Sequence, residues 1–160
     1  ILFPHGVLFR DEEYELRKKL VEIDIVDCVI GLGPNLFFNA SMEACIIICR
    51  TRKDTARKKS ILFINAIKEV TRKNAESYLE DEHIRRVAQA YLEGKQEDDF
   101  CRLVQMDEIV NNNYDLSIQK YIFINATNET GTLNLKNSLS DWEQNHNKGM
   151  FYYENLIKML

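Results

Sequence analysis

Three nearly continuous apolar runs constrain the fold of this chain more than any other feature. They span residues 25–30, 44–49 and 60–65, and each is rich in isoleucine, valine, leucine or cysteine. Runs of this length that do not alternate with polar residues are typical of strands buried on both faces of a sheet. Since both faces need cover from other elements, the sequence predicts an α/β domain with helices packed on its sheet.

The segments around these runs give the expected order of elements. Ile1 to Pro4 resembles the end of a strand, and Asp11 is a suitable N-cap for a helix of about three turns. The polar link over residues 50–59 predicts that the second and third runs form an antiparallel hairpin or two neighbouring strands. The expected order is therefore β-α-β-β-β, an α/β sheet with an antiparallel edge.

Helical patterns dominate after the third run. Asp81 is a suitable cap for an amphipathic helix that ends at Gly94. Residues 67–124 are therefore expected to form a mostly helical extension. Residues 125–160 are predicted to form a polar loop and a C-terminal helix, whose apolar side chains pack on this chain or contact another subunit.

Composition and charge exclude several classes of protein. The 160 residues are 45% hydrophobic and 29% charged, which is typical of a soluble globular protein. No apolar run approaches the roughly 20 residues that cross a membrane. The net charge of −4 argues against a protein whose whole surface is basic and binds nucleic acid. Contact with DNA would have to occur through a local basic patch. The four cysteines lack C-x-x-C spacing, which favours buried thiols in a reducing, cytoplasmic compartment.

Three motifs that suggest chemistry have simpler structural interpretations. The glycines of residues 31–33 lack the third glycine and the helix of a nucleotide-binding loop, so a turn after a strand is favoured. The acids and the histidine of residues 80–83 suit a helix start better than a metal site, because no second ligand cluster exists. His5 and His146 have no recognisable nucleophile beside them, so the sequence predicts neither a metal site nor a hydrolase triad.

Two other features are candidate binding sites. Phe37 and Phe38 lie in a break between buried runs, where one ring can join the core and the other can be exposed at the end of the sheet. Ligands of α/β proteins bind at such strand ends, although core packing of both rings is the alternative. The second feature is a basic stretch that is either a solvated tip or a contact to DNA phosphates. Its cations are Arg50, Arg52, Lys53, Arg57, Lys58 and Lys59.

Four stretches in unbroken order are similar to one protein family. They are residues 3–37, 58–66, 81–94 and 100–123, and the first opens with the motif Pro-x-Gly-Val-Leu-Phe. Together they resemble the later part of the catalytic domain in the DNA-methylating (modification) subunit of type I restriction–modification systems. The resemblance implies that residues 1–66 are the C-terminal portion of a class I (Rossmann-like) methyltransferase sheet with an antiparallel edge, followed by a helical extension.

The resemblance also implies an activity and a binding residue. Members of this family transfer a methyl group from S-adenosylmethionine to adenine N6 in DNA, which requires the adenine to be flipped out of the duplex. The aromatic residue that stacks on the flipped base falls on Phe37, with Phe38 as the second candidate. The implied partners are double-stranded DNA and the specificity and restriction subunits of a type I complex.

Several family motifs are absent or altered in this chain. The glycine-rich donor motif and the catalytic Asn-Pro-Pro-Phe lie upstream of the matched region, and the only prolines here are Pro4 and Pro34. We therefore expect a piece of a longer enzyme that contains no catalytic or cofactor-binding residue, binds S-adenosylmethionine negligibly and is inactive alone. Gly33 replaces a proline of the family and residues 39–43 differ from its pattern, which suggests a divergent loop.

Two alternatives remain open. The chain is either part of a methyltransferase or a non-enzymatic module that docks on the other subunits of the same complex. An unrelated nucleotide-binding α/β protein would need a complete phosphate loop, which the sequence does not contain. In either of the first two cases a sheet cut near Ile1 would expose an edge, so the sequence predicts that the chain self-associates.

Overall fold

Two fully buried parallel strands form the centre of the structure. They are β2 (Val26–Leu32) and β4 (Ser60–Ala66), and every residue of both is buried. They pair in parallel with Ile30 opposite Ile64. Their unbroken apolar sequence follows from this position, because side chains on both faces contact other elements. This computed structural model describes residues 1–37, 41–73 and 76–122.

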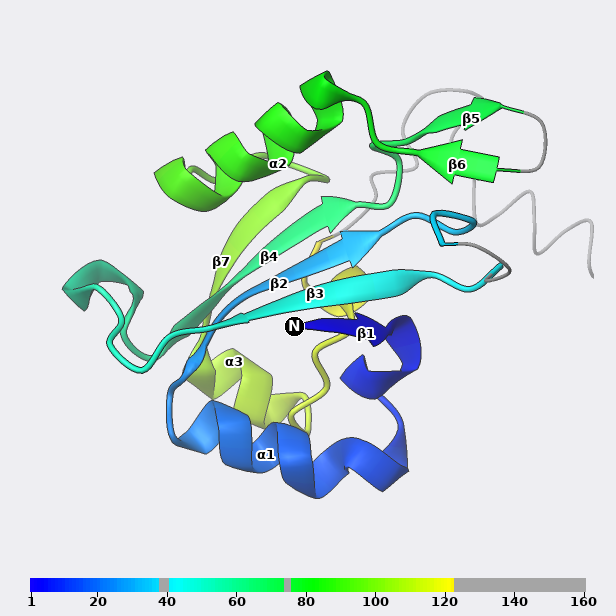
Figure 1. Ribbon diagram of the computed structural model, residues 1–160. Coiled ribbons are helices and arrows are strands. Elements are labelled where there is room, and N and C mark those ends of the chain that lie inside the picture. The colour runs from blue at the N-terminus through cyan, green and yellow to red at the C-terminus, as the bar shows by residue number, and fades with distance from the viewer. Residues whose placement is uncertain (38–40, 74–75, 123–160) are drawn as a thin grey trace, which may run out of the picture. The chain divides into compact units, whose positions relative to one another are not determined.

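Three shorter strands complete a mixed sheet around this pair. They are β1 (Leu2–Pro4), β3 (Ala44–Cys49) and β7 (Cys101–Gln105). The strand order is β1-β3-β2-β4-β7, as Figure 1 shows. Strand β3 runs antiparallel to β2, β1 runs antiparallel to β3, and β7 runs antiparallel to β4. The predicted α/β fold with antiparallel edge strands is therefore confirmed as a five-stranded mixed sheet.

The predicted pairing of the second and third apolar runs is wrong. Strand β2 lies between β3 and β4, so these two strands are not neighbours. Both edges of a buried strand need hydrogen-bonding partners, and β2 obtains them from β3 on one side and β4 on the other. Residues 50–59 cross the end of β2, a distance of about 10 Å that a linker of this length spans easily.

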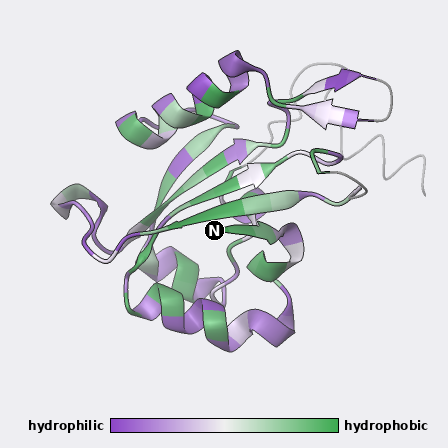
Figure 2. Ribbon diagram, viewed as in Figure 1, coloured by the Kyte–Doolittle hydropathy of each residue, from purple (hydrophilic) through white to green (hydrophobic). Residues whose placement is uncertain are grey.

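Helices cover both faces of the sheet and divide the core in two. One face carries α1 (Tyr14–Glu22), α3 (Met106–Asn111) and α4 (Ile118–Tyr121), and the other carries α2 (Asp81–Glu93). Side chains of β4 alternate between them, with Phe63 in the first core and Leu62 in the second. Figure 2 shows the hydrophobic colour concentrated on the central strands, whereas the helices are mixed.

Two helices begin at different residues from those predicted. A 3₁₀ turn over Asp11–Glu13 precedes α1, which begins at Tyr14. The cap of α2 is Glu80 and not Asp81, because Glu80 and His83 form a capping box in which the Glu80 backbone N–H donates to Nδ1 of His83 at 3.2 Å. Other 3₁₀ turns cover His5–Leu8 and Thr55–Arg57.

The segment predicted to be mostly helical also contains three strands. A two-stranded hairpin, β5 (Thr71–Lys73) with β6 (Glu76–Tyr78), precedes α2, and β7 follows it. Strand β7 pairs with the outer edge of β4, whose backbone groups would otherwise lack hydrogen-bonding partners. The described residues lie in one compact unit, 1–124, so the expected boundary after residue 66 falls inside that unit. Residues 125–160 lie outside the described part.

No helix in the described part of the chain is both long enough and apolar enough to cross a membrane.

Candidate functional site

Phe37 lies on an exposed turn after the carboxyl end of β2. The turn passes through Asn35, whose φ of 60° lies in the left-handed region that asparagine tolerates. Leu36 packs against the core beneath α2, whereas Phe37 is 40% exposed. The buried leucine therefore anchors the turn, and the exposed ring offers an aromatic face at the end of the sheet. Phe38, the second candidate, lies outside the described residues.

Gly33 lets this turn pass close to the segment that follows β4. A Cβ atom at Gly33 would lie 2.6 Å from the carbonyl oxygen of Ile67 and 3.2 Å from Cγ1 of Val70. The nearer atom belongs to the backbone and cannot rotate away, so neither a side chain nor a proline ring fits without movement of the segment. The packing around Ile67 thus gives a structural reason for a glycine at the position where the family pattern has proline.

The β5–β6 hairpin is joined to the Phe37 turn by a backbone hydrogen bond. The N–H of Ser77 donates to the carbonyl oxygen of Asn35 at 2.9 Å. Ser77 is buried and its hydroxyl has no partner among the described residues, while Tyr78 is 41% exposed. Sequence reasoning missed this hairpin. The signal that could have revealed it is the pair of β-favouring residues Thr71 and Tyr78 on either side of a polar turn.

The basic stretch lies at the opposite end of the sheet from Phe37. Arg50 follows the last residue of β3, Cys49, which pairs with Val26, the first residue of β2. Phe37 instead follows Leu32, the last residue of β2. The length of β2 separates the two regions by about 20 Å or more. The structure therefore does not bring the two predicted binding features together.

Two of the six cations in the basic stretch are engaged inside the protein. The side chain of Lys53 is only 2% exposed, and its Nζ lies 2.7 Å from both Oδ1 of Asp24 and the carbonyl oxygen of Ser60. Arg57 Nη1 donates to Oδ2 of Asp27 at 3.3 Å. These contacts hold the crossing loop against the sheet. The exposed cations of the stretch are Arg50, Arg52, Lys58 and Lys59, of which Arg50 also donates to the Tyr91 hydroxyl at 2.9 Å.

Asp27 is the centre of a polar cluster under α2. Its buried carboxylate accepts hydrogen bonds from the hydroxyl of Tyr91 at 2.8 Å and from Arg57, while Arg50 Nε lies 3.5 Å away. The guanidinium groups of Arg50 and Arg57 also lie over the Tyr91 ring. Burial and the bond to Asp27 raise the pKa of Tyr91. This cluster fastens α2 to the sheet, which accounts for the buried acid without a catalytic role.

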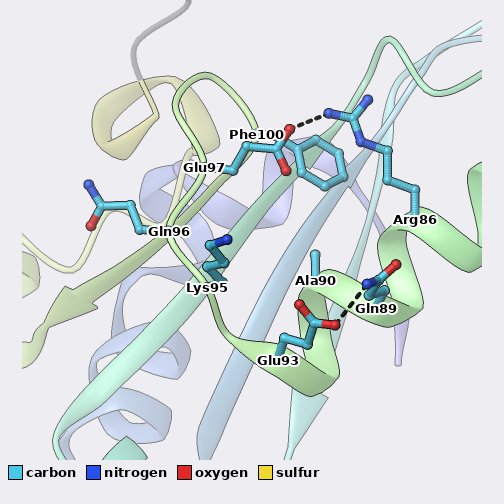
Figure 3. A pocket seen from close by; sticks show the side chains of 8 residues that line it. All are labelled: Arg86, Gln89, Ala90, Glu93, Lys95, Gln96, Glu97 and Phe100. Atoms are coloured by element: carbon cyan, nitrogen blue, oxygen red, sulfur yellow. Dashed lines mark hydrogen bonds and ion pairs between the residues drawn. The ribbon is translucent and has the colours of Figure 1, made fainter.

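A hollow of about 480 Å³ lies between the C-terminal half of α2 and the loop that follows it. Its lining residues, shown in Figure 3, are Arg86, Gln89, Ala90, Glu93, Lys95, Gln96, Glu97 and Phe100. Arg86 lies over the Phe100 ring at 4.0 Å and forms ion pairs with Glu97 and Glu69. Gln89 donates to Glu93. The hollow is lined by two cations, Arg86 and Lys95, and by two acids, Glu93 and Glu97. Because these charges balance and Arg86 is paired with Glu69 and Glu97, the hollow has no excess of positive charge that would favour a phosphate.

Metal-ligating groups do not gather anywhere in the part of the chain that the structure describes. His5 contacts Glu43 at 3.6 Å, and His83 belongs to the cap of α2. Cys28, Cys45 and Cys101 are buried, as predicted for structural thiols. The same prediction is wrong for Cys49, which is exposed because it is the last residue of β3. The exposed ring of Phe37 at the carboxyl end of β2 is therefore the feature that best matches a binding site.

The family of the chain follows from comparison with known proteins. The profile described as N-6 DNA Methylase matches residues 1–130, which include the whole sheet and the Phe37 turn. The chain belongs to the N-6 DNA methylase family. The resemblance to methylase subunits of type I restriction–modification systems is thereby confirmed.

Relatives among the N-6 DNA methylases include type I methylase subunits from several organisms. The MjaVIII methylase subunit of Methanocaldococcus jannaschii is 39% identical over 127 residues, and the MpnII methylase subunit of Mycoplasma pneumoniae is 33% identical over 130 residues. These matches cover 76% and 81% of this chain but only 22% and 23% of the relatives. The chain therefore spans less than a quarter of the length of these two curated relatives.

Solved structures show the same fold. The type I methyltransferase subunit of Streptococcus thermophilus is 39% identical, with a TM-score of 0.70, over 76% of this chain and 26% of that one. A chain from a study of type I complex assembly covers 98% of this chain and 35% of its own length, at 18% identity and a TM-score of 0.57. The match to the M protein of the EcoKI enzyme covers 75% of this chain and 33% of that protein's chain, at 12% identity and a TM-score of 0.59. The last two similarities concern the fold alone.

N-6 DNA methylases use S-adenosylmethionine, but the residues of this chain do not fit its binding site. Strand β2 ends in Gly31-Leu32-Gly33 and leads through a turn to β3, another strand. A helix N-terminus after a glycine-rich turn is what receives the ligand in a donor or nucleotide site of this fold class. Neither this arrangement within the described residues nor an Asn-Pro pair in the sequence is present. No step of the reaction is therefore assigned to a cofactor held by this chain.

Proposed function

We propose that this chain is the C-terminal portion of the catalytic domain of a type I modification methyltransferase, and that Phe37 stacks on the target adenine. The observation that carries the proposal is an exposed aromatic ring at the carboxyl end of a central parallel strand. Ligands of open α/β sheets bind at that end. The family membership of the chain supports the reaction class, methylation of adenine N6 in DNA.

The role proposed for Phe37 follows from the energetics of base flipping. An adenine that leaves the duplex loses its stacking on both neighbours, and an aromatic side chain returns about 1–3 kcal/mol of this per base. Leu36 packs against the core and fixes the backbone beside Phe37, so the turn that carries the ring is in place before the base arrives. A preorganised ring loses less conformational freedom on binding than a mobile one.

The rest of the reaction belongs to residues outside this chain. S-adenosylmethionine supplies the methyl group when it is bound to the parent enzyme. The donor-binding motif and the residues that contact the adenine amino group are proposed to precede Ile1 in the parent. We accordingly expect no measurable methyl transfer by the 160-residue chain alone, and calorimetry that detects micromolar binding of S-adenosylmethionine to it would overturn the domain assignment.

In the parent complex we propose three partners for the chain. They are double-stranded DNA and the specificity and restriction subunits of a type I assembly in the cytoplasm. A docking module without enzymatic activity is the second candidate function. Two exposed apolar side chains on α2, Ile84 and Leu92, favour a protein contact along that helix.

The test compares two variants of the full-length parent subunit in its complex. Phe37→Ala should reduce methyl transfer to a cognate duplex by about 5- to 150-fold, since about 1–3 kcal/mol of stacking is lost. Phe37→Trp restores an aromatic face and should recover most of the activity.

Control measurements separate the two candidate functions. Thermal melts should show that Phe37→Ala folds normally, because the side chain is partly exposed. Phe38→Ala should cost mainly stability if the second ring faces the core. Normal methylation by Phe37→Ala would remove the stacking role. A variant in which Ile84 and Leu92 are replaced tests the docking module. If it loses subunit assembly but still flips the base, the docking function is favoured.

A further inference from the structure

The β5–β6 hairpin and the segment before it bring positive charge to the end of the sheet that carries Phe37. Lys68, Arg72 and Lys73 are exposed. None of them has an ion pair with another described residue, in contrast to Arg86, which is held between two acids. Residues 68–80 also contain three acids, Glu69, Glu76 and Glu80, and Glu69 is paired with Arg86. The positive charge is therefore confined to strand β5 and Lys68. Strand β5 is accordingly hydrophilic in Figure 2.

The hairpin holds these cations at a defined distance from the Phe37 turn. Arg72 pairs with Ser77 in the hairpin, and the Ser77 N–H donates to Asn35 in the turn. Two successive strand spacings of about 4.8 Å place the Arg72 backbone within about 10 Å of Asn35. That distance corresponds to about three nucleotides of one DNA strand at 3.4 Å each. A side chain of Arg72 can therefore reach a phosphate close to a base that contacts Phe37.

The contacts of the turn make this a fixed arrangement. Gly33 lies against the Ile67 carbonyl, which belongs to the connection between β4 and the hairpin. The same connection carries Lys68, and its side chain is exposed. The turn that bears the aromatic ring thus contacts the hairpin at Ser77 and the connection before the hairpin at Ile67.

We propose that Arg72 and Lys73, supported by Lys68, bind the DNA phosphates that flank the flipped adenine. The inference rests on the proposed function and assigns the backbone contact to the hairpin in place of the basic stretch at residues 50–59. Phosphate contacts fix the position and register of a duplex without reading its sequence. Glu76 lies opposite Lys73 in the hairpin and weakens this contact, because its charge repels phosphate.

The test measures DNA binding by the 160-residue chain through fluorescence anisotropy of a short labelled duplex. Arg72→Ala/Lys73→Ala should reduce the slope of log affinity against log salt by about two, because each lost phosphate contact removes about 0.9. The loss should be the same for unrelated duplex sequences. Arg52→Ala/Lys58→Ala is the matched control, since it removes two exposed cations at the opposite end and should leave the slope unchanged.

Two further variants complete the design. Glu76→Gln should strengthen binding at low salt, and Arg72→Lys should keep the slope of the wild type because it keeps the charge. Circular dichroism melts should be unaltered for all variants, whose side chains are exposed. An unchanged slope in Arg72→Ala/Lys73→Ala, an equal loss in the control, or no DNA binding by the wild-type chain at low salt would each overturn the inference.

The outcomes also distinguish this inference from the proposed function. Phe37→Ala tests base stacking through methyl transfer, whereas the hairpin variants test phosphate binding through salt dependence. A normal salt slope together with lost methylation in Phe37→Ala would refute the hairpin contact alone. A reduced slope in the hairpin variant together with normal methylation in Phe37→Ala would refute the stacking role alone.

Discussion

The hydroxyl group of Tyr91 on α2 donates a hydrogen bond of 2.8 Å to Oδ2 of Asp27 on β2. The two residues are 64 positions apart in the sequence. Arg50 donates to the same tyrosine oxygen at 2.9 Å, so this hydroxyl links the crossing loop, the helix and the central strand. The contact closes the polar cluster that fastens α2 over the second core.

Removal of this hydroxyl should lower the free energy of unfolding. Tyr91→Phe leaves the buried Asp27 with one partner fewer, and we expect a loss of about 1–2 kcal/mol in urea denaturation. Asp27→Ala should cost about 3–5 kcal/mol, because it leaves the Arg57 guanidinium without its acid. Tyr78→Phe is the control, since that tyrosine is exposed and has no hydrogen bond with another described residue. If Tyr91→Phe is as stable as wild type, the cluster does not hold α2.

A side chain at position 33 should distort the Phe37 turn. Gly33→Ala places a Cβ atom 2.6 Å from the carbonyl oxygen of Ile67, and relief of that contact should cost about 1–3 kcal/mol. Gly31→Ala is the comparison, because its Cβ atom would meet no backbone atom among its nearest neighbours and would lie 3.0 Å from Cγ1 of Ile118, a longer contact than the one at position 33. Thermal melts of both variants check the difference. Equal stabilities would mean that the segment at Ile67 adapts without cost.

The carboxylate of Asp115 should contribute a stabilisation that disappears in acid. Burial alone would raise its pKa, but hydrogen bonds from Lys120 and from the hydroxyl and backbone N–H of Ser117 outweigh burial and hold the pKa below its ordinary value. Because the pKa of Asp115 is lower in the folded state than in the unfolded state, its carboxylate stabilises the protein at any pH above the unfolded pKa of about 4. This stabilisation is lost as the pH falls through the lower pKa of the folded state.

Asp115→Asn provides the measurement of this contribution. We expect it to lower the free energy of unfolding by about 1–2 kcal/mol at neutral pH, because the bonds to a charged acceptor weaken. As the pH falls below the ordinary carboxyl pKa of about 4, the difference between wild type and variant should shrink, since wild-type Asp115 is increasingly protonated. Lys120→Met should reproduce part of the neutral-pH loss. A difference that stays constant across this pH range would show that charge is not its source.

Thiol labelling should distinguish one cysteine from the other three. Burial raises the pKa of Cys45 and Cys101 to about 11 and that of Cys28 well above its usual range, and it also blocks access to reagents. Cys49 is exposed at the end of β3. A disulfide reagent at pH 8 should therefore label Cys49 rapidly and the others only after unfolding in urea. Rapid labelling in a Cys49→Ser variant would contradict the described packing.

The outer edge of β1 should promote self-association of the isolated chain. Within the described residues β1 pairs only with β3, and Ile1 and Leu2 next to its free edge are 70% and 50% exposed. Exposed strand edges pair readily with other chains. Light scattering at high concentration should show dimers or larger species, and Leu2→Pro should reduce them because proline removes a donor from the edge. A monomer at all concentrations would contradict this prediction.

Local sequence determined the central strands and the main amphipathic helix. The runs that form β2 and β4 are apolar throughout because both faces are buried, and this pattern is visible without any knowledge of neighbours. The helix that ends at Gly94 was equally clear, since glycine adopts the positive φ of 62° that stops it there. Ordered short matches along the chain were sufficient to indicate the family.

Long-range contacts decided the strand order, the fate of the basic stretch and the surroundings of Phe37. The local sequence does not indicate that β2 lies between β3 and β4, because strand pairing depends on which strand edges still lack hydrogen-bonding partners as the sheet assembles. Lys53 is buried because Asp24, 29 positions away, and the nearby Ser60 carbonyl offer oxygen atoms where its side chain ends. The hairpin lies beside the Phe37 turn for the same reason, since the bond from Ser77 to Asn35 exists only in the folded chain. A local pattern records whether a residue is buried, whereas the identity of its neighbours arises only when distant segments meet.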